Sequence, residues 1–362
     1  MIYLAAFCLS AGLAILITFL VIKLAIKYDI LDKPRSDEGN RHIHKKPVAL
    51  MGGLGVFLAF FITIIIEIFF TDSFLGGFLL PKHLIVMLVG GGILILGGIL
   101  DDKFTLNPSR QIIFPIVSAL LVIIGGIGIE YINNPFGNPL CLDQIQLTLF
   151  SYQGIPYQII LLADIFAFVW ILGASYTTKF LDGLDGLVAS ITTVGAFVIF
   201  ILSLTQNVAQ PETALLSITL VGALVGYLVH AWHPAKIFFG EGGSLFCGFM
   251  LAVLAILAGS KVATALLILG IPILDVIWVI GRRIFQKKSP FMADRKHLHF
   301  RLLDVGFSYN QAVLFLIAIT VVFGFSSLFL QSQQKLIALI ILGVIMVVLA
   351  AILVFIYRRK KS

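Results

Sequence analysis

Uncharged apolar runs that are long enough to cross a bilayer are the feature that most constrains this chain. The first run begins near Tyr3 and continues past Ile22, and a helix of roughly 20 such residues spans the hydrocarbon core of a membrane. The mean hydropathy of +1.08 and the 31 phenylalanines lie far outside the range of a soluble domain. The sequence therefore predicts an all-α polytopic membrane protein, whose first run is too long for a signal-peptide core and is expected to be a retained helix.

Eleven segments have the length and apolar character of transmembrane helices. They lie near residues 3–26, 48–70, 83–100, 111–130, 157–177, 186–204, 213–231, 243–259, 262–281, 309–331 and 335–357. Basic residues follow the first and ninth segments and form the tail RRKK, whereas the connections 131–156 and 205–212 contain no Lys or Arg. Because basic loops stay in the cytoplasm, we expect an N-terminus outside, a cytoplasmic C-terminus, and one integral-membrane domain over residues 1–362.

The net charge of +7 is therefore mainly a topology signal. Lys and Arg beside a membrane also attract anionic lipid headgroups. Nucleic-acid binding needs a soluble basic face or a recognisable fold, and the sequence contains neither, so we exclude that partner. The three cysteines Cys8, Cys141 and Cys247 are odd in number and widely scattered, which indicates neither a disulfide framework nor a zinc site.

Five acidic residues stand at span ends on the predicted cytoplasmic face. They are Asp101 and Asp102 in GGILDDKFTLNPSR, Asp182 and Asp185 in KFLDGLDGLVAS, and Glu241 in AKIFFGEGGSLFCG. Clustered carboxylates repel one another unless a cation or water lies between them. Oxygen ligands of this kind suit Mg2+, with Mn2+ as a substitute, and water and substrate phosphates complete the shell. The sequence therefore predicts one divalent-metal site, with Asp182 and Asp185 on one face of a helix.

Each of these motifs also has a purely structural interpretation. A pair of aspartates at a helix end is typical of a cap or a solvated terminus. For DGLDG the case for binding is stronger than for that pair, because its glycines permit close approach of the backbone to a ligand. The GEGGS segment is compatible with a simple turn and also with an anion-binding nest at a helix N-terminus.

The ninth connection, SPFMADRKHLHFRLLDVGFS, contains His297 and His299 among basic residues. Two histidines at i and i+2 do not share a helix face, which argues against an HExxH zinc site and favours a loop around a ligand. Cations and imidazoles in such a loop suit a diphosphate. The alternative is a solvated basic loop with incidental histidines.

The order of these motifs resembles the polyprenyl-phosphate N-acetylhexosamine-1-phosphate transferases, glycosyltransferase family 4. The resemblance covers most of residues 29–308. It runs from DKPRSDEGNRHIHKKPVALMGGLGVF through DDKFTL, FLDGLDGL, PAKIFFGEGGSLF and PILDVIWVIGRR to SPFMADRKHLHFRLL. The last motif is more similar to the GlcNAc-1-phosphate transferase branch than to the phospho-MurNAc-pentapeptide translocases.

This resemblance implies an activity in the bacterial cytoplasmic membrane. A HexNAc-1-phosphate, by default GlcNAc-1-phosphate, would pass from a UDP-sugar to undecaprenyl phosphate with release of UMP, which starts a lipid-linked cell-envelope glycan. The site would lie at the cytoplasmic face, with Mg2+ as cofactor. The cytoplasmic loops are expected near residues 27–47, 101–110, 178–185, 232–242 and 282–308.

The resemblance also implies roles for individual residues. The catalytic set is Asp101, Asp102, Asp182 and Asp185, in which Asp101 or Asp102 binds or deprotonates the acceptor. The metal ligands are Asp102, Asp185 and Glu241. The substrate-binding set is His44, Lys46, Lys179, His297, His299 and Arg301.

Four residues depart from the family pattern. Lys179 and Ala231 replace Asn, Glu241 replaces Asp, and Phe300 replaces His. Lys179 lies one helical turn before Asp182, where a cation would weaken divalent binding. The departures leave open a catalytically weakened paralogue that binds prenyl phosphate.

Two further alternatives concern transport and oligomeric state. A membrane transporter is a third reading because acids in membranes often mark ion pathways, although these acids stand at span ends. The glycines of GGGILILGG at 90–98 permit close helix packing within one chain or between two, which leaves a homodimer open.

Overall fold

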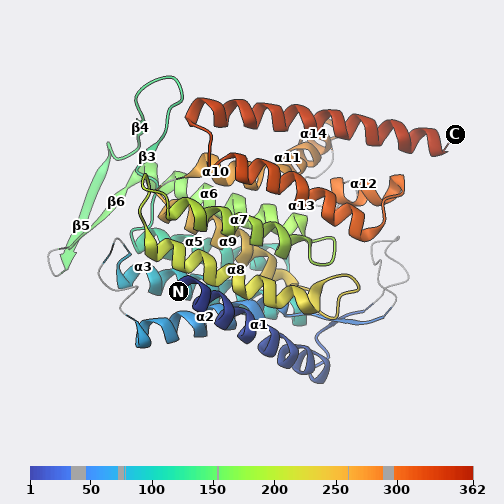
Figure 1. Ribbon diagram of the computed structural model, residues 1–362, viewed down its shortest axis with the longest axis horizontal. Helices are drawn as coiled ribbons and strands as arrows, with labels where there is room; N and C mark the ends of the chain where they lie inside the picture. Colours follow the sequence, from blue (N-terminus) through green and yellow to red (C-terminus); the bar gives the residue numbers. More distant parts are fainter. Residues whose placement is uncertain are drawn as a thin grey trace.

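The computed structural model describes residues 1–33, 46–71, 77, 79–152, 155–259, 261–287 and 297–361. Most of them form helices that run side by side (Figure 1). The helices are α1 Ile2–Lys27, α2 Gly52–Phe70, α3 Pro81–Phe104, α4 Pro108–Gln111, α5 Ile113–Ile124, α6 Leu161–Leu181, α7 Leu187–Ser203, α8 Pro211–Ala231, α9 Gly240–Leu257, α10 Val262–Ile268, α11 Gly270–Phe285, α12 Leu298–Val305, α13 Tyr309–Ser326 and α14 Ser332–Lys361.

Within the described residues, eight helices are long and apolar enough to cross a membrane. The pair α10 and α11, bent by 75°, makes a ninth span if it is counted as one. The apolar helices Pro108–Ile124 and Leu187–Ser203 are shorter. Each of the eleven predicted segments overlaps one of these helices, so the prediction of a helical polytopic membrane protein is confirmed. The count of eleven and the orientation of the termini stay predictions.

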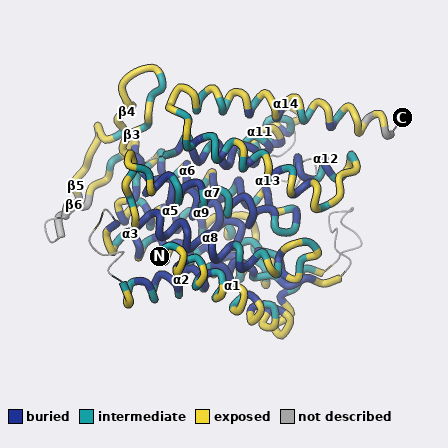
Figure 2. Tube along the Cα trace, in the orientation of Figure 1, coloured by how far each residue is buried: buried dark blue, intermediate teal, exposed yellow. Residues whose placement is uncertain are grey.

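Helix α9 forms the centre of the bundle (Figure 2). In the most apolar stretch of α9, 94% of the residues are buried, whereas the corresponding shares are 28% in α1 and 22% in α14. Helix α9 packs against α2, α3, α6 and α7. A helix that is apolar on all sides is stable when other helices surround it. The peripheral helices instead expose apolar side chains, as expected of surfaces that face lipid.

Glycines allow α9 to approach α2 and α3 until the backbones touch. A Cβ atom at Gly98 of α3 would overlap the backbone of Gly242, and one at Gly53 of α2 would overlap Gly243. Two glycines of the GEGGS segment are therefore explained by helix packing. In the 90–98 stretch, Gly91 lies against Phe246 and Gly97 against Phe114 of the same chain. These glycines are used within one chain and give no support to a homodimer.

Short strands attach the first loop to the segment that precedes α9. Strand β1 (Leu31–Asp32) pairs with β2 (Val48–Ala49) in an antiparallel ladder, and Ala49 forms a parallel bridge with Ile237. The Phe238 N–H donates to the Ala49 carbonyl at 2.8 Å, and the Gly52 N–H donates to the Phe238 carbonyl at 2.9 Å. The chain before α2 is thereby held beside the N-terminus of α9.

Two hairpins lie at the opposite end of the bundle from α12 (Figure 1). Strands β3 (Tyr131–Ile132) and β4 (Leu140–Cys141) pair antiparallel, as do β5 (Gln146–Tyr152) and β6 (Ile155–Ile160). The predicted span 157–177 is therefore wrong at its start, because residues up to Ile160 belong to a strand. Helix α6 begins at Leu161, and the Asp164 carboxylate accepts the Ile160 N–H at 3.0 Å, which satisfies one free donor at that end.

Replacing Gly98 by Ala should lower the melting temperature, because the new methyl group would overlap the backbone of Gly242. Overpacking of this kind costs about 1–3 kcal/mol. The matched control is Gly173→Ala in α6, where nothing lies within 4 Å of the new Cβ and where Ala is the better helix former. Thermal melting of both variants in detergent tests this, and equal melting temperatures would contradict the packing argument.

Candidate active site

One cavity of 380 Å3 gathers acids from four separate segments of the chain. Its walls include Asp101, Asp102, Asp182, Asp185 and Glu241. Other residues on the walls are Asp32, Tyr227, His233, Phe300 and Tyr309. The acids that stand far apart in the sequence therefore face one common space, at the ends of α3 and α6 and the start of α9.

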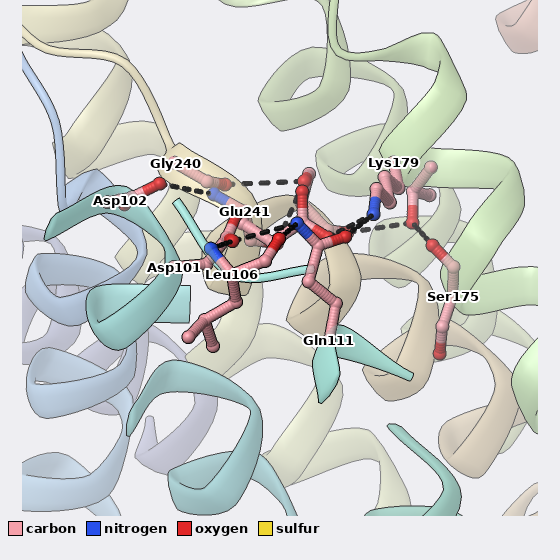
Figure 3. Close-up of polar contacts among 10 residues, drawn as sticks. Asp101, Asp102, Leu106, Gln111, Ser175, Lys179, Gly240 and Glu241 are labelled. Carbon is pink, nitrogen blue, oxygen red and sulfur yellow. Dashed lines mark hydrogen bonds and ion pairs between the residues drawn. The ribbon is translucent and has the colours of Figure 1, made fainter. Parts of the chain in front are cut away.

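Asp102 joins the last turn of α3 to the first turn of α9 (Figure 3). Its Oδ1 atom accepts the Glu241 N–H at 3.2 Å. Gly240 has a φ of 72°, which favours glycine, and a side chain there would overlap the Asp102 carboxylate. With the packing of Gly242 and Gly243, this accounts for the glycines of GEGGS without a phosphate-binding nest.

Asp101 holds the turn that follows α3 and also orients Gln111 of α4. Its Oδ1 atom accepts the Leu106 N–H and the Gln111 Nε2 donor, each at 2.8 Å. Gln111 Nε2 also donates to the Leu106 carbonyl at 3.1 Å. The two acceptors fix the amide so that Gln111 Oε1 faces Lys179 Nζ at 3.5 Å (Figure 3). The sequence contained no pattern that singled out Gln111.

Lys179 and Glu241, two of the four departures from the family pattern, form an ion pair with each other (Figure 3). Their side chains are 21% and 17% exposed. Lys179 Nζ also lies 5.4 Å from the centre of the Tyr176 ring, within the range of a cation–π contact. We expected Lys179 to act on Asp182 along one helix. The ion pair forms with Glu241 of α9 instead.

The prediction that Asp182 and Asp185 share a helix face is wrong. Helix α6 ends at Leu181 and α7 begins at Leu187, so both aspartates lie in the turn between them. Gly186 has a φ of 71°, and a Cβ atom at Gly183 would overlap the His299 imidazole. These two glycines allow the chain to turn there while both aspartates still line the cavity.

The Asp182 carboxyl is open to the cavity but surrounded by protein and by other acids. Burial, together with the charges of Glu241 and Asp185, raises the pKa of Asp182 to about 7. Crowded carboxylates of this kind favour either a proton or a cation in the site.

Asp185 is held by donors from two other elements. Its Oδ2 atom accepts from His233 Nδ1 at 2.7 Å and from the Ala235 N–H at 3.1 Å. Its Oδ1 atom accepts from the Tyr309 hydroxyl at 3.1 Å. Sequence reasoning missed both partners. His233 stands one residue before the PAKIFFGEGG motif, and no pattern marked Tyr309.

Asp275 of α11 fixes the start of α12, where His297 lies. The His297 Nδ1 atom lies 2.8 Å from Asp275 Oδ2, and the Leu298 N–H donates to Asp275 Oδ1 at 2.9 Å. We did not predict a role for Asp275. The signal for it was an acid inside the apolar run PILDVIWVIGRR, because ionisable residues in such runs are rare and often functional.

His299 packs on the turn that carries the aspartates. Its side chain is buried, and neither ring nitrogen has a hydrogen-bond partner among the described residues. Burial lowers the pKa of His299 to about 4, so the imidazole is neutral at pH 7. The rings of His297 and His299 are nearly parallel, 5.8 Å apart. Phe300 lines the cavity, whereas His297, His299 and Arg301 do not.

The first loop contributes less than predicted to the described site. Lys46 is exposed and does not line the cavity, and His44 lies outside the described residues. Asp32 of the same loop does line it.

The carboxylates fit a hard divalent cation by their chemistry. In the part of the chain that the structure describes, no three His, Cys, Asp or Glu side chains form a ready-made metal cluster. Mg2+ commonly takes only one or two carboxylates and completes its shell with water and substrate phosphates. The oxygen donors on this cavity wall suit that mode of binding.

Comparisons with known proteins give a consistent result. The model of the family described as Glycosyl transferase family 4 matches residues 84–259. The chain is 29% identical to "Probable undecaprenyl-phosphate N-acetylglucosaminyl 1-phosphate transferase" of Bacillus subtilis (strain 168), over 94% of this chain and 88% of that protein. It is 28% identical to "Decaprenyl-phosphate N-acetylglucosaminephosphotransferase" of Mycolicibacterium smegmatis, over 80% and 73%. It is 27% identical to "Undecaprenyl-phosphate alpha-N-acetylglucosaminyl 1-phosphate transferase" of Yersinia pestis, over 81% and 75%.

The raised pKa of Asp182 predicts how stability depends on pH without metal. Between the ordinary pKa of 3.8 and about 7, the folded protein keeps a proton that the unfolded chain loses, so stability falls as pH rises through this window. In EDTA, Asp182→Asn should show a smaller loss of melting temperature between about pH 5 and 8 than the parent does. An equal loss in the variant and the parent would contradict the assignment.

Proposed function

We propose that this chain, whose residues 84–259 match the model of Glycosyl transferase family 4, transfers N-acetylglucosamine 1-phosphate from UDP-N-acetylglucosamine to undecaprenyl phosphate and releases UMP. The observation that carries the proposal is the single cavity lined by acids from three motifs. The names of the relatives support the sugar phosphate and the polyprenyl phosphate acceptor. The lipid-linked product would start a cell-envelope glycan.

The proposed setting is the bacterial cytoplasmic membrane. The chain forms one domain over residues 1–362, with eleven spans, the N-terminus outside and the C-terminus in the cytoplasm. The cavity then opens to the cytoplasmic face, where the UDP-sugar is made available and the lipid phosphate lies at the membrane surface. The cytoplasmic loops are those near residues 27–47, 101–110, 178–185, 232–242 and 282–308. Their basic residues support this orientation.

The reaction exchanges one phosphoanhydride for another. An oxygen of the lipid phosphate attacks the phosphorus that carries the sugar, and the bond from that phosphorus to the oxygen of UMP breaks. No net proton is consumed, because one anhydride is broken and one is formed. Phosphoryl transfer of this kind depends mainly on positioning and on neutralisation of charge.

The site residues divide these tasks. Asp102, Asp185 and Glu241 would hold Mg2+, or Mn2+ in its place, and the bound ion would supply positive charge for the diphosphate. Asp182 faces the cavity and binds metal or nucleotide, and Asp101 or Asp102 binds or deprotonates the acceptor phosphate. His44, Lys46, Lys179, His297, His299 and Arg301 would contact the donor phosphates when the substrate is bound. The ion pair with Glu241, which lines the cavity, supports a place for Lys179 close to the bound phosphates.

Purified protein in detergent, supplied with labelled UDP-N-acetylglucosamine, undecaprenyl phosphate and Mg2+, should form lipid-linked sugar and UMP. EDTA should abolish turnover, and Mg2+ or Mn2+ should restore it. Asp102→Asn should lower turnover about 100-fold with little change in melting temperature. Full activity without metal would refute the metal role. No turnover, combined with retained binding of prenyl phosphate, would favour the weakened paralogue.

Replacing Lys179 by Asn should lower the Mg2+ concentration for half-maximal activity, because it removes a cation that is paired with Glu241. Glu241→Asp alone should have its clearest effect in the Lys179→Asn background, since contacting residues are coupled. Metal titrations of both single variants and the double variant measure this. If Lys179→Asn abolishes activity that the parent possesses, Lys179 is itself an essential phosphate ligand and the prediction is wrong.

A further inference from the structure

Two aromatic side chains on the cavity wall have no role in the scheme above. His233 lies between α8 and α9, and Tyr309 is the first residue of α13. Their rings stack with centres 4.1 Å apart and planes inclined by 14°. Both line the cavity, and both contact the same carboxylate, that of Asp185.

The contacts determine the position of Asp185 closely. The Tyr309 hydroxyl donates to Asp185 Oδ1 at 3.1 Å and accepts the Asp185 N–H at 3.0 Å, so one oxygen binds both the side chain and the backbone of that residue. His233 Nδ1 lies 2.7 Å from Oδ2, which also accepts the Ala235 N–H at 3.1 Å. The carboxylate is therefore held at both oxygens by groups from outside its own turn.

These donors leave the carboxylate able to bind a cation. The two oxygens of an ionised carboxylate offer about four lone-pair sites, and three donors occupy three of them. The charge of the neighbouring Asp182 opposes an ionised carboxylate at Asp185, and the donors offset this repulsion. Partners that orient a metal-binding carboxylate typically change metal affinity or activity by about 10- to 100-fold when removed.

We propose that His233 and Tyr309 are positioning residues that hold the Asp185 carboxylate in the orientation that binds a divalent cation. This inference rests on the proposed function, because it concerns the metal of that same site. The competing explanation is that both residues only anchor α13 and the segment after α8 to the aspartate turn. An anchor changes the melting temperature, whereas a positioning residue changes the affinity for the metal.

Three variants separate the two explanations. Tyr309→Phe removes the hydroxyl and keeps the ring stack. His233→Phe keeps a ring against Tyr309 and removes the nitrogen, whereas His233→Asn retains an N–H donor near the position of Nδ1. The matched controls are Tyr131→Phe in β3 and His230→Gln in α8. In the parent, the His230 ring contacts the Ile15 carbonyl of α1, far from Asp185 in the sequence.

The experiment titrates the full-length protein in detergent with Mn2+ alone and measures free Mn2+ by electron paramagnetic resonance. Tyr309→Phe and His233→Phe should weaken Mn2+ binding about 10- to 100-fold, and the metal-free melting temperatures should stay close to that of the parent. His233→Asn should bind Mn2+ nearly as the parent does, and both controls should match the parent. In turnover assays at saturating Mg2+, Tyr309→Phe and His233→Phe should reach a kcat close to that of the parent.

Unchanged Mn2+ affinity in Tyr309→Phe and His233→Phe would overturn the proposal, and so would a parent that binds no Mn2+. Loss of binding in His233→Asn equal to that in His233→Phe would also count against a role of the Nδ1 donor. The titration uses no nucleotide sugar or lipid. Failure to turn over UDP-N-acetylglucosamine would therefore refute the proposed function and leave the positioning role to be judged by the Mn2+ result alone.

Discussion

Backbone contact between α9 and its neighbours α2 and α3 determines the geometry of the whole site. Gly242 and Gly243 allow this approach, and it brings the Glu241 N–H within 3.2 Å of the Asp102 carboxylate. A larger residue at either glycine would separate the helices and pull the two acids apart. Because α9 lies at the centre of the bundle, the other elements that carry acids are positioned relative to it. Gly242 and Gly243 therefore serve both the packing of the helices and the placement of the acids. For this reason the stability of the fold and the geometry of the site depend on the same residues.

The second constraint is the free energy of holding several carboxylates in one cavity. Four of the five acids predicted for the site each have a different donor. Asp101 binds an amide, Asp102 a backbone N–H, Asp185 an imidazole and a hydroxyl, and Glu241 the Lys179 ammonium. Apart from Gln111, these donors come from elements that are distant in sequence from the acids they contact, so the acids can remain close only in the folded protein. Hydrogen bonds and opposite charges favour the ionised form, whereas burial, together with the charges of Glu241 and Asp185, raises the pKa of Asp182 to about 7. A cation or a proton at that position completes the balance of charge.

Much of the fold could be predicted from the sequence, because apolar length identifies membrane helices reliably. The acids could also be assigned to one face, since each stands at the end of an apolar segment. The turn at Asp182 and Asp185 could not, because spacing of three residues favours a helix face and the left-handed Gly186 is visible only in the structure. The strand at Ile155–Ile160 was missed because a short apolar run does not distinguish strand from helix. Gln111, His233 and Tyr309 were missed because their roles depend on tertiary contacts alone.

The pairing of Lys179 with Glu241 bears on how the departures from the family pattern should be judged. Taken one at a time, a lysine among acids and a longer acid both look damaging to a metal site. In the structure they meet, and the longer side chain of Glu241 reaches the ammonium from the first turn of α9. Gln111 Oε1 also accepts from the same ammonium, because its amide is oriented by Asp101 and Leu106. Substitutions that contact one another alter the site as a unit. The altered residues thus form an organised polar network. In it, the Lys179 ammonium neutralises part of the carboxylate charge that a divalent metal would otherwise neutralise alone.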